Sequence, residues 1–140
     1  MIDEFIYKIC GLLINKPVSV QWFAKQLGVK HITDYMLPWH PLKITQNGVQ
    51  DITVVNFPNT DLVSYIRIDL DDNANFDVKG IIEKLGMYHK LPTSKWGGPS
   101  ELTFEVNGKI FEFNGRIIFE SNDYQDVQSE FMVQAILIIP

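Results

Sequence analysis

The stretch that decides the fold is Glu101–Glu120, which reads ELTFEVNGKIFEFNGRIIFE. It contains two Asn-Gly dipeptides, at residues 107–108 and 114–115, and this dipeptide is typical of two-residue type I′ hairpin turns. If both turns are tight, Phe104 pairs with Phe111, and Phe111 pairs with Ile118, on one face of a sheet. The stretch therefore predicts a three-strand antiparallel meander over about residues 101–120.

The segment after the meander ends in an apolar run. A polar stretch at residues 121–129 is followed by residues 131–139, which read FMVQAILII. Strands with nearly continuous apolar sequence are usually covered on both faces. We therefore expect this strand near the centre of the sheet.

Strand patterns also precede the meander. Residues 42–45 and 52–57 flank the turn dipeptide Asn47-Gly48, and residues 62–70 alternate between apolar and polar side chains. The alternation predicts one face made by Leu62, Ser64, Ile66, Ile68 and Leu70, and a second face made by Tyr65, Arg67 and Asp69. Residues 30–41 contain two prolines close together and predict a loop or an edge segment. Residues 87–100, with two prolines and two glycines, predict a long connection.

Three stretches have the period of amphipathic helices. Residues 3–14 form the first; residues 19–28 form the second, which Ser19 caps and Gly28 ends. Residues 78–85 form the third, capped by Asp77 and ended by glycine. Because the helices cluster instead of alternating with the strands, the order favours an α+β fold with a largely antiparallel sheet of about six to seven strands. We interpret residues 1–140 as a single domain.

The composition limits the classes of function. The 140 residues include 17 acidic and 12 basic side chains, which give a net charge of −5. Nucleic acid and anionic membranes both attract a surplus of Lys and Arg, so this balance argues against either partner. The first residues are acidic, whereas a secretory signal begins with basic residues. The sequence has one cysteine, and no apolar run is long enough to span a bilayer. We therefore expect a cytoplasmic protein.

One segment resembles half of a DNA-binding motif. Within residues 19–39, residues 23–29 (FAKQLGV) resemble the first helix and turn of a helix-turn-helix. The recognition helix would occupy residues 30–39, where Asp34 stands at an apolar packing position and Pro38 interrupts the end. The segment also lacks arginine, the usual reader of guanine. DNA binding through this degenerate motif is an alternative that the sequence disfavours.

Residues 69–77 (DLDDNANFD) resemble part of a calcium-binding loop. Oxygen-bearing side chains recur at alternate positions, as in an EF-hand. However, Ala74 and Gly80 stand where an EF-hand has its turn glycine and its bidentate glutamate. A polar turn is the better interpretation. The three histidines share no metal-ligand spacing, and Cys10 lies in an apolar helix as an inert core thiol, so we expect no metal and no cofactor.

Two tryptophans in irregular segments are candidates for contacts with a protein partner. Trp39 lies between prolines and Trp96 lies beside two glycines. Tryptophan in a rigid loop buries a large area at small entropic cost. Together with the acidic turn, the candidate binding residues are Trp39, Trp96, Asp69, Asp71 and Asp72.

The chain resembles small bacterial toxin-immunity proteins in its size, its acidity, its lack of a signal peptide and its plan of helices and meander. The resemblance implies a non-catalytic binding module that blocks a partner protein, such as a toxin, by covering it with a preformed acidic face. The alternative is an enzyme or a small-ligand-binding protein, whose site is assembled only in the fold around His40, His89 and Arg67.

Overall fold

The computed structural model describes residues 2–14, 17–29, 37–72, 74, 78–91, 100–108, 110–121 and 133–140, with the backbone alone for residues 88–91 and 100. These residues form three helices and one antiparallel sheet, which confirms the predicted α+β class. The helices are α1 (Ile2–Leu12), α2 (Val20–Gln26) and α3 (Val78–Leu85). The strands are β1 (Trp39–Leu42), β2 (Val49–Asn56), β3 (Val63–Leu70), β4 (Met87–Leu91), β5 (Ser100–Asn107), β6 (Asn114–Ser121) and β7 (Ala135–Ile139).

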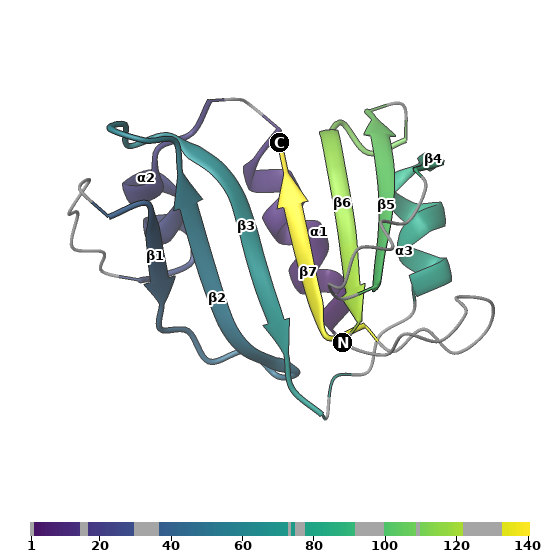
Figure 1. Ribbon diagram of the computed structural model, residues 1–140, viewed down its shortest axis with the longest axis horizontal. Helices are drawn as coiled ribbons and strands as arrows, with labels where there is room; N and C mark the ends of the chain where they lie inside the picture. The colour runs from purple at the N-terminus through teal and green to yellow at the C-terminus, as the bar shows by residue number, and fades with distance from the viewer. Residues whose placement is uncertain are drawn as a thin grey trace.

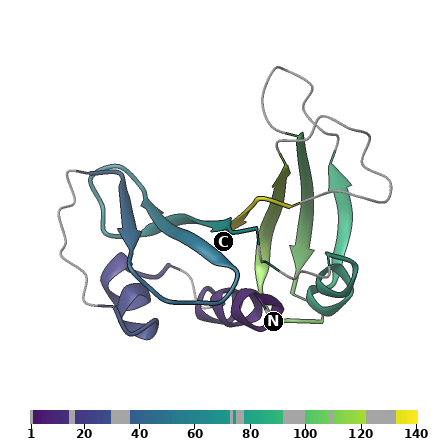
Figure 2. The same ribbon diagram turned by 90° about the horizontal axis from the view of Figure 1, so that it is seen from below.

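The sheet has seven strands in the order β1-β2-β3-β7-β6-β5-β4. Strand β7 pairs with β3 on one side and with β6 on the other, which confirms the prediction that this apolar strand is central. It joins a first wing, β1–β3, to a second wing, β4–β6. In Figure 2 the two wings stand at a steep angle, because neighbouring strands are each rotated by about 20–25°.

All three helices lie on one face of the sheet. Figure 2 shows them together on its lower side, and Figure 1 looks onto the opposite face, with α1 and α2 behind the strands. That opposite face carries no helix of the described residues, and we name it the open face. In the same residues, no helix has the length and the apolar composition needed to cross a membrane.

The hydrophobic core fills the space between the helices and the sheet. Strand register places two buried rows on the helix side: Val54, Ile66, Ile138, Ile117 and Phe104; and Leu42, Ile52, Ile68, Ile136, Phe119 and Leu102. The helices cover these rows with Ile6, Ile9, Phe23, Ile81 and Leu85, which are fully buried. Each such side chain contributes about 1.5–3 kcal/mol relative to an exposed one.

The ends of α2 follow from its sequence as predicted. The Ser19 side chain accepts a hydrogen bond of 3.0 Å from the backbone N–H of Trp22, which caps the first turn. Gly28 follows the helix with φ of +75°, a conformation that glycine adopts without steric cost. Helix α3 has the bounds that its period predicts; its predicted cap, Asp77, lies outside the described residues.

The predicted meander over residues 101–120 is wrong in its detail. These residues form two strands, β5 and β6, and Phe104 lies opposite Ile117 instead of Phe111. The dipeptide Asn114-Gly115 begins β6 and makes no turn; its glycine lies where the backbone of β7 passes closely. A Cβ atom on Gly115 would overlap the carbonyl oxygen of Ile139 on β7. The third strand of the meander is β4, within the segment that we expected to be a connection.

A β-bulge in β3 corrects the predicted faces of that strand. Val55 lies opposite Tyr65, but the next residue of β2 lies opposite Val63, so Ser64 is an extra residue. An extra residue reverses the side to which the following side chains point. Val63 is therefore buried on the helix side, whereas Leu62, predicted to face the core, is 36% exposed.

The edge strand β1 contains Pro41, the last residue of the segment that was predicted to be a loop or an edge segment. The N–H of Asn56 donates to the carbonyl of Pro38 at 3.0 Å, so residues 38, 40 and 42 are the ones that bond to β2. Pro41 therefore faces outward, where its missing N–H breaks no bond and removes a donor from the free edge. Because β1 begins at Trp39, the recognition helix that a helix-turn-helix would need at residues 30–39 does not extend to residue 39; residues 30–36 lie outside the described residues.

Candidate protein-contact surface

The open face has a cluster of exposed apolar side chains at one end of the first wing. The cluster consists of Leu37, Trp39, Phe57 and Leu62, and we name it the apolar end. Between 36% and 51% of each of these residues is exposed, whereas most large apolar residues of the fold are buried. Exposed apolar groups of this size that gather in one place are typical of contact sites.

Backbone pairing brings these four residues together. The hydrogen bond from Asn56 to Pro38 places Leu37 beside Phe57. The N–H of Phe57 donates to the carbonyl of Leu62 at 3.0 Å, so these two residues are also neighbours across the β2–β3 turn. Trp39 lies opposite Val55, and Val55 lies opposite Tyr65. The apolar end thus continues into a row of two half-buried side chains on the same face.

Side-chain hydrogen bonds fix the turn that carries Phe57 and Leu62. The Asn56 side-chain amide donates to the carbonyl of Thr60 at 2.9 Å. The hydroxyl of Thr60 donates to the carbonyl of Phe57 at 2.9 Å and accepts from the N–H of Leu62 at 3.2 Å. Asn59 takes up the positive φ of 59° that the turn requires. The backbone of the turn that carries Phe57 and Leu62 is therefore fixed by side-chain hydrogen bonds within the turn.

Helix α2 is tied to the same turn. The N–H of Val20 donates to the carbonyl of Asp61 at 2.7 Å, and the N–H of Val63 donates to the carbonyl of Val18 at 2.9 Å. Trp22, in the first turn of α2, is 42% exposed. A third large aromatic side chain is therefore exposed at this end of the molecule, on the helix that lies on the other face of the sheet (Figure 1).

Charged side chains occupy the middle of the open face. Arg67 on β3 pairs with Asp69 at 3.2 Å and, across β7, with Glu120 on β6 at 2.9 Å. The crossing is possible because Ala135, which lies opposite both carboxylates, is small. Burial alone would lower the pKa of Arg67, but the two carboxylates outweigh burial and raise this pKa above its ordinary value. The arginine thus ties the two wings together.

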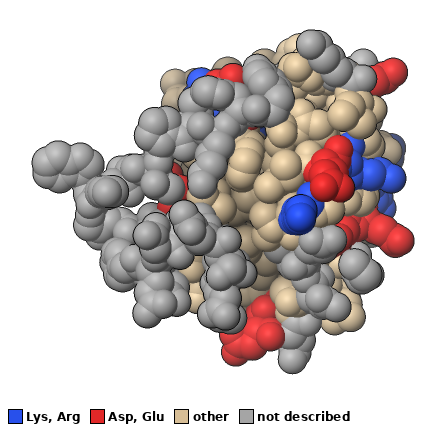
Figure 3. Space-filling view, turned by 90° about the vertical axis from the view of Figure 1, so that its right-hand side faces the viewer, with Lys and Arg blue, Asp and Glu red and all other residues tan. Residues whose placement is uncertain are grey.

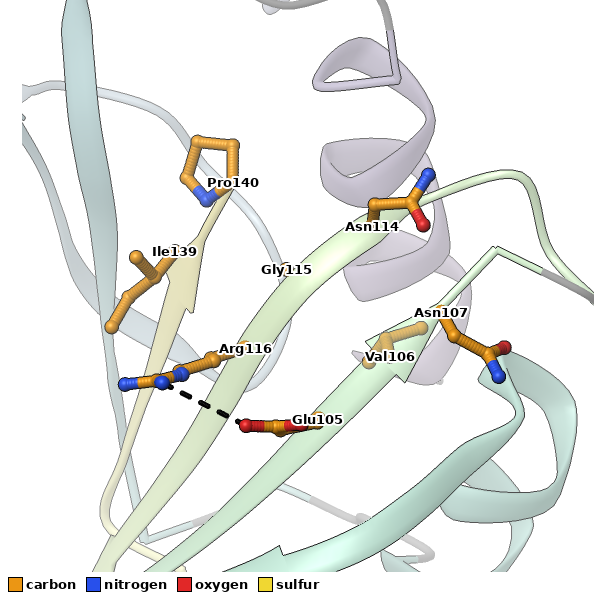
Figure 4. Close-up of a pocket in the computed structure, with 8 residues that line it drawn as sticks. All are labelled: Glu105, Val106, Asn107, Asn114, Gly115, Arg116, Ile139 and Pro140. Carbon is orange, nitrogen blue, oxygen red and sulfur yellow. Dashed lines mark ion pairs between the residues drawn. The ribbon is translucent and has the colours of Figure 1, made fainter.

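A shallow pocket of about 450 Å³ lies on the second wing beside the end of β7. Figure 4 shows Arg116 and Glu105 facing each other at its wall, where they form an ion pair of 3.7 Å. The side chains of Asn107 and Asn114 lie at the other end, near the β5–β6 loop. The polar groups of this pocket therefore do not converge on one point, as a catalytic site requires.

Two of the three residues of the alternative small-molecule site lie on opposite faces of the sheet. His40 is buried on the helix side of the sheet, whereas Arg67 lies on the open face. The side chain of His89 lies outside the described residues. Burial raises the pKa of the Cys10 thiol from 9.0 to about 12, so this thiol is a poor nucleophile near neutral pH.

The structure places four of the five predicted binding residues. Trp39 and Asp69 share the open face. Trp39 lies level with Tyr65 on β3, which is four residues from Asp69, or about 13 Å along the strand. Asp71 follows β3 and its N–H donates to Gly48, while Asp72 is exposed in the turn. Trp96 lies outside the described residues. The sequence reasoning missed Leu37, Phe57 and Leu62; Phe57 precedes a Pro-Asn turn, and this is the one sequence signal of its exposure.

The segment that resembles part of a calcium-binding loop, residues 69–77, is only partly described. Asp69 is paired with Arg67, and Asn73 and Asp77 lie outside the described residues. Among the residues that are described, no three His, Cys, Asp or Glu side chains gather as metal ligands.

Figure 3 shows the side of the molecule that carries α3, β4 and β5. Acidic and basic side chains of the described residues lie there in small mixed groups, separated by uncharged ones. This visible side therefore does not form a patch of one sign. In comparisons with protein-family models, with curated protein sequences and with solved structures, nothing matches the chain.

Proposed function

We propose that this protein is a non-catalytic binding module that blocks a partner protein by covering it with the open face of its sheet. The observation that carries the proposal is the apolar end, in which Leu37, Trp39, Phe57 and Leu62 are exposed side by side. An exposed cluster with two aromatic anchors, Trp39 and Phe57, suits a protein partner better than a small ligand, which needs a concave site.

The rigidity of the apolar end supports this proposal. Association costs free energy when side chains and loops must be ordered. The turn that carries Phe57 and Leu62 is already fixed by hydrogen bonds from Asn56 and Thr60. A partner that buries this surface therefore meets a turn that is already ordered, and the free-energy cost of ordering it on binding is smaller.

Blocking by occlusion also fits the resemblance to toxin-immunity proteins. Such an inhibitor needs a surface that is complementary to its target and requires no chemistry of its own. We therefore propose inhibition of a partner protein, with a toxin as the first candidate, as the biological role. Trp39 is the anchor that the sequence and the open face have in common.

The proposal is tested by affinity capture from the native lysate with three tagged proteins. The first is the wild type and the second is the double variant Trp39→Ala/Phe57→Ala. The third is the control Ile110→Ala, which removes a side chain that is 71% exposed in the β5–β6 loop. We expect one protein to be captured by the wild type and by the control, and to be lost with the double variant, by about 100-fold in affinity.

Circular dichroism must show that all three proteins are folded. Equal capture by the wild type and the double variant would show that the apolar end does not bind the captured protein. Recovery of no specific protein with the wild type would count against the binding role itself.

A further inference from the structure

Four carboxylates stand in one row across the open face. Asp51 lies opposite Asp69, Asp69 and Glu120 both lie opposite Ala135, and Glu101 lies opposite Glu120. We name these four residues the acidic row. The row crosses β2, β3, β7, β6 and β5, and its members are far apart in the sequence, so only the strand order assembles it.

The row contains two pairs of like charges in direct opposition. Asp51 faces Asp69, and Glu101 faces Glu120, and such pairs destabilise a sheet. Arg67 pairs with the two inner carboxylates, Asp69 and Glu120. The two outer carboxylates lie at the ends of the row, where Asp51 is exposed and Glu101 is half-buried.

The described strand positions of the open face carry more negative than positive charge. They hold five carboxylates, the acidic row and Glu105, against two guanidinium groups, Arg67 and Arg116. These positions therefore carry an excess of three negative charges, and Trp39 lies about 13 Å along the strands from the acidic row. Charge of this sign repels nucleic acid and attracts a basic protein surface.

We propose that the occupant of the open face is a basic protein surface, with Lys or Arg side chains against Asp51 and Glu101 and an apolar side chain against Trp39 and Phe57. This inference rests on the proposed function and specifies the chemistry of its partner. Along the strands, the partner's apolar group and the basic group against Asp51 lie about 13 Å apart, because Trp39 lies opposite Val55, four residues from Asp51 on β2.

The test uses the isotope-labelled full-length protein and two synthetic peptides, followed by NMR. One peptide carries Trp, a first Lys four residues later and a second Lys six residues after the first, so that an extended backbone spans about 13 Å from Trp to the first Lys and about 19 Å from that Lys to the second. The other carries Glu in place of Lys. We expect the Lys peptide to shift the backbone signals of Trp39, Phe57, Asp51 and Glu101, and to bind about fivefold more tightly than the Glu peptide at low salt.

Two variants with equal changes of charge sharpen the test. Asp51→Asn/Glu101→Gln should abolish the preference for the Lys peptide. Glu4→Gln/Glu83→Gln, which removes two exposed carboxylates from the helix side, should preserve it. Raising the salt to about 300 mM should reduce the preference in the wild type, because these charges are screened.

The outcomes separate this inference from the proposed function. Equal binding of both peptides at the apolar end would overturn the basic chemistry and leave the docking surface standing. An absence of shifts on the open face with either peptide would also overturn this inference, while capture that depends on Trp39 would still decide the proposed function by itself.

Discussion

The substitution Gly115→Ala tests the centre of the sheet. Gly115 lies near the start of β6, with φ of +156°, beside the last residue of β7. A Cβ atom there would overlap the carbonyl oxygen of Ile139 and would approach the ring of Phe113 to 3.0 Å. No rotamer change relieves a clash with backbone, so the end of β7 has to move. Overpacking costs about 1–3 kcal/mol and a strained φ costs a similar amount.

We therefore expect Gly115→Ala to lower the free energy of unfolding by about 2–4 kcal/mol. The assay is urea denaturation followed by circular dichroism at constant m-value. Gly11→Ala is the matched control, since no atom lies within 4 Å of the added methyl group in α1. It should stabilise the protein by about 0.5–1 kcal/mol. A loss below about 1 kcal/mol for Gly115→Ala would refute the placement of β7 against β6.

Two further predictions concern the first two helices. Burial raises the pKa of the Cys10 thiol from 9.0 to about 12, so the folded state holds the thiol proton more tightly than the unfolded state does. The contribution of this thiol to the free energy of unfolding is fully present below pH 9.0 and is lost as the pH rises toward 12. In urea denaturation at pH 8 to 10.5, wild type should thus lose up to about 1.4 kcal/mol per pH unit more than Cys10→Ala, and parallel curves would contradict the burial. Removing the α2 cap with Ser19→Ala should cost about 1 kcal/mol in thermal unfolding, while Ser19→Thr, which keeps a hydroxyl, should cost much less; equal losses would show that the cap contributes nothing.

The parts of the fold that the sequence predicts are those with local causes. Ser19 and Gly28 bound α2 through hydrogen bonds and dihedral angles within a few residues. The central place of β7 follows from its apolar run, which needs cover on both faces. Gly115 misled the prediction, because glycine is required both for a tight turn and where another backbone passes closely. Only the position of Ile139, from a different part of the chain, distinguishes the two.

The candidate surface was less predictable because it depends on strand register. The alternation of residues 62–70 assigns Leu62 to the core, and the single extra residue at Ser64 reverses this assignment. Trp39 was identified from its neighbouring prolines, but the residues that complete the apolar end lie at positions 37, 57 and 62. No local pattern joins them. The pairing of β1 with β2 and the hydrogen bonds of the β2–β3 turn join them.

The arrangement of charge on the open face has one further consequence. Arg67 compensates the two inner carboxylates of the acidic row, and Ala135 is small enough to let it do so. Four strand spacings, about 19 Å, separate the two outer carboxylates, Asp51 and Glu101. A single basic side chain cannot pair with both of them. A partner that neutralises the acidic row therefore needs two basic groups at that separation, and this requirement distinguishes a shaped protein surface from a single flexible cationic side chain.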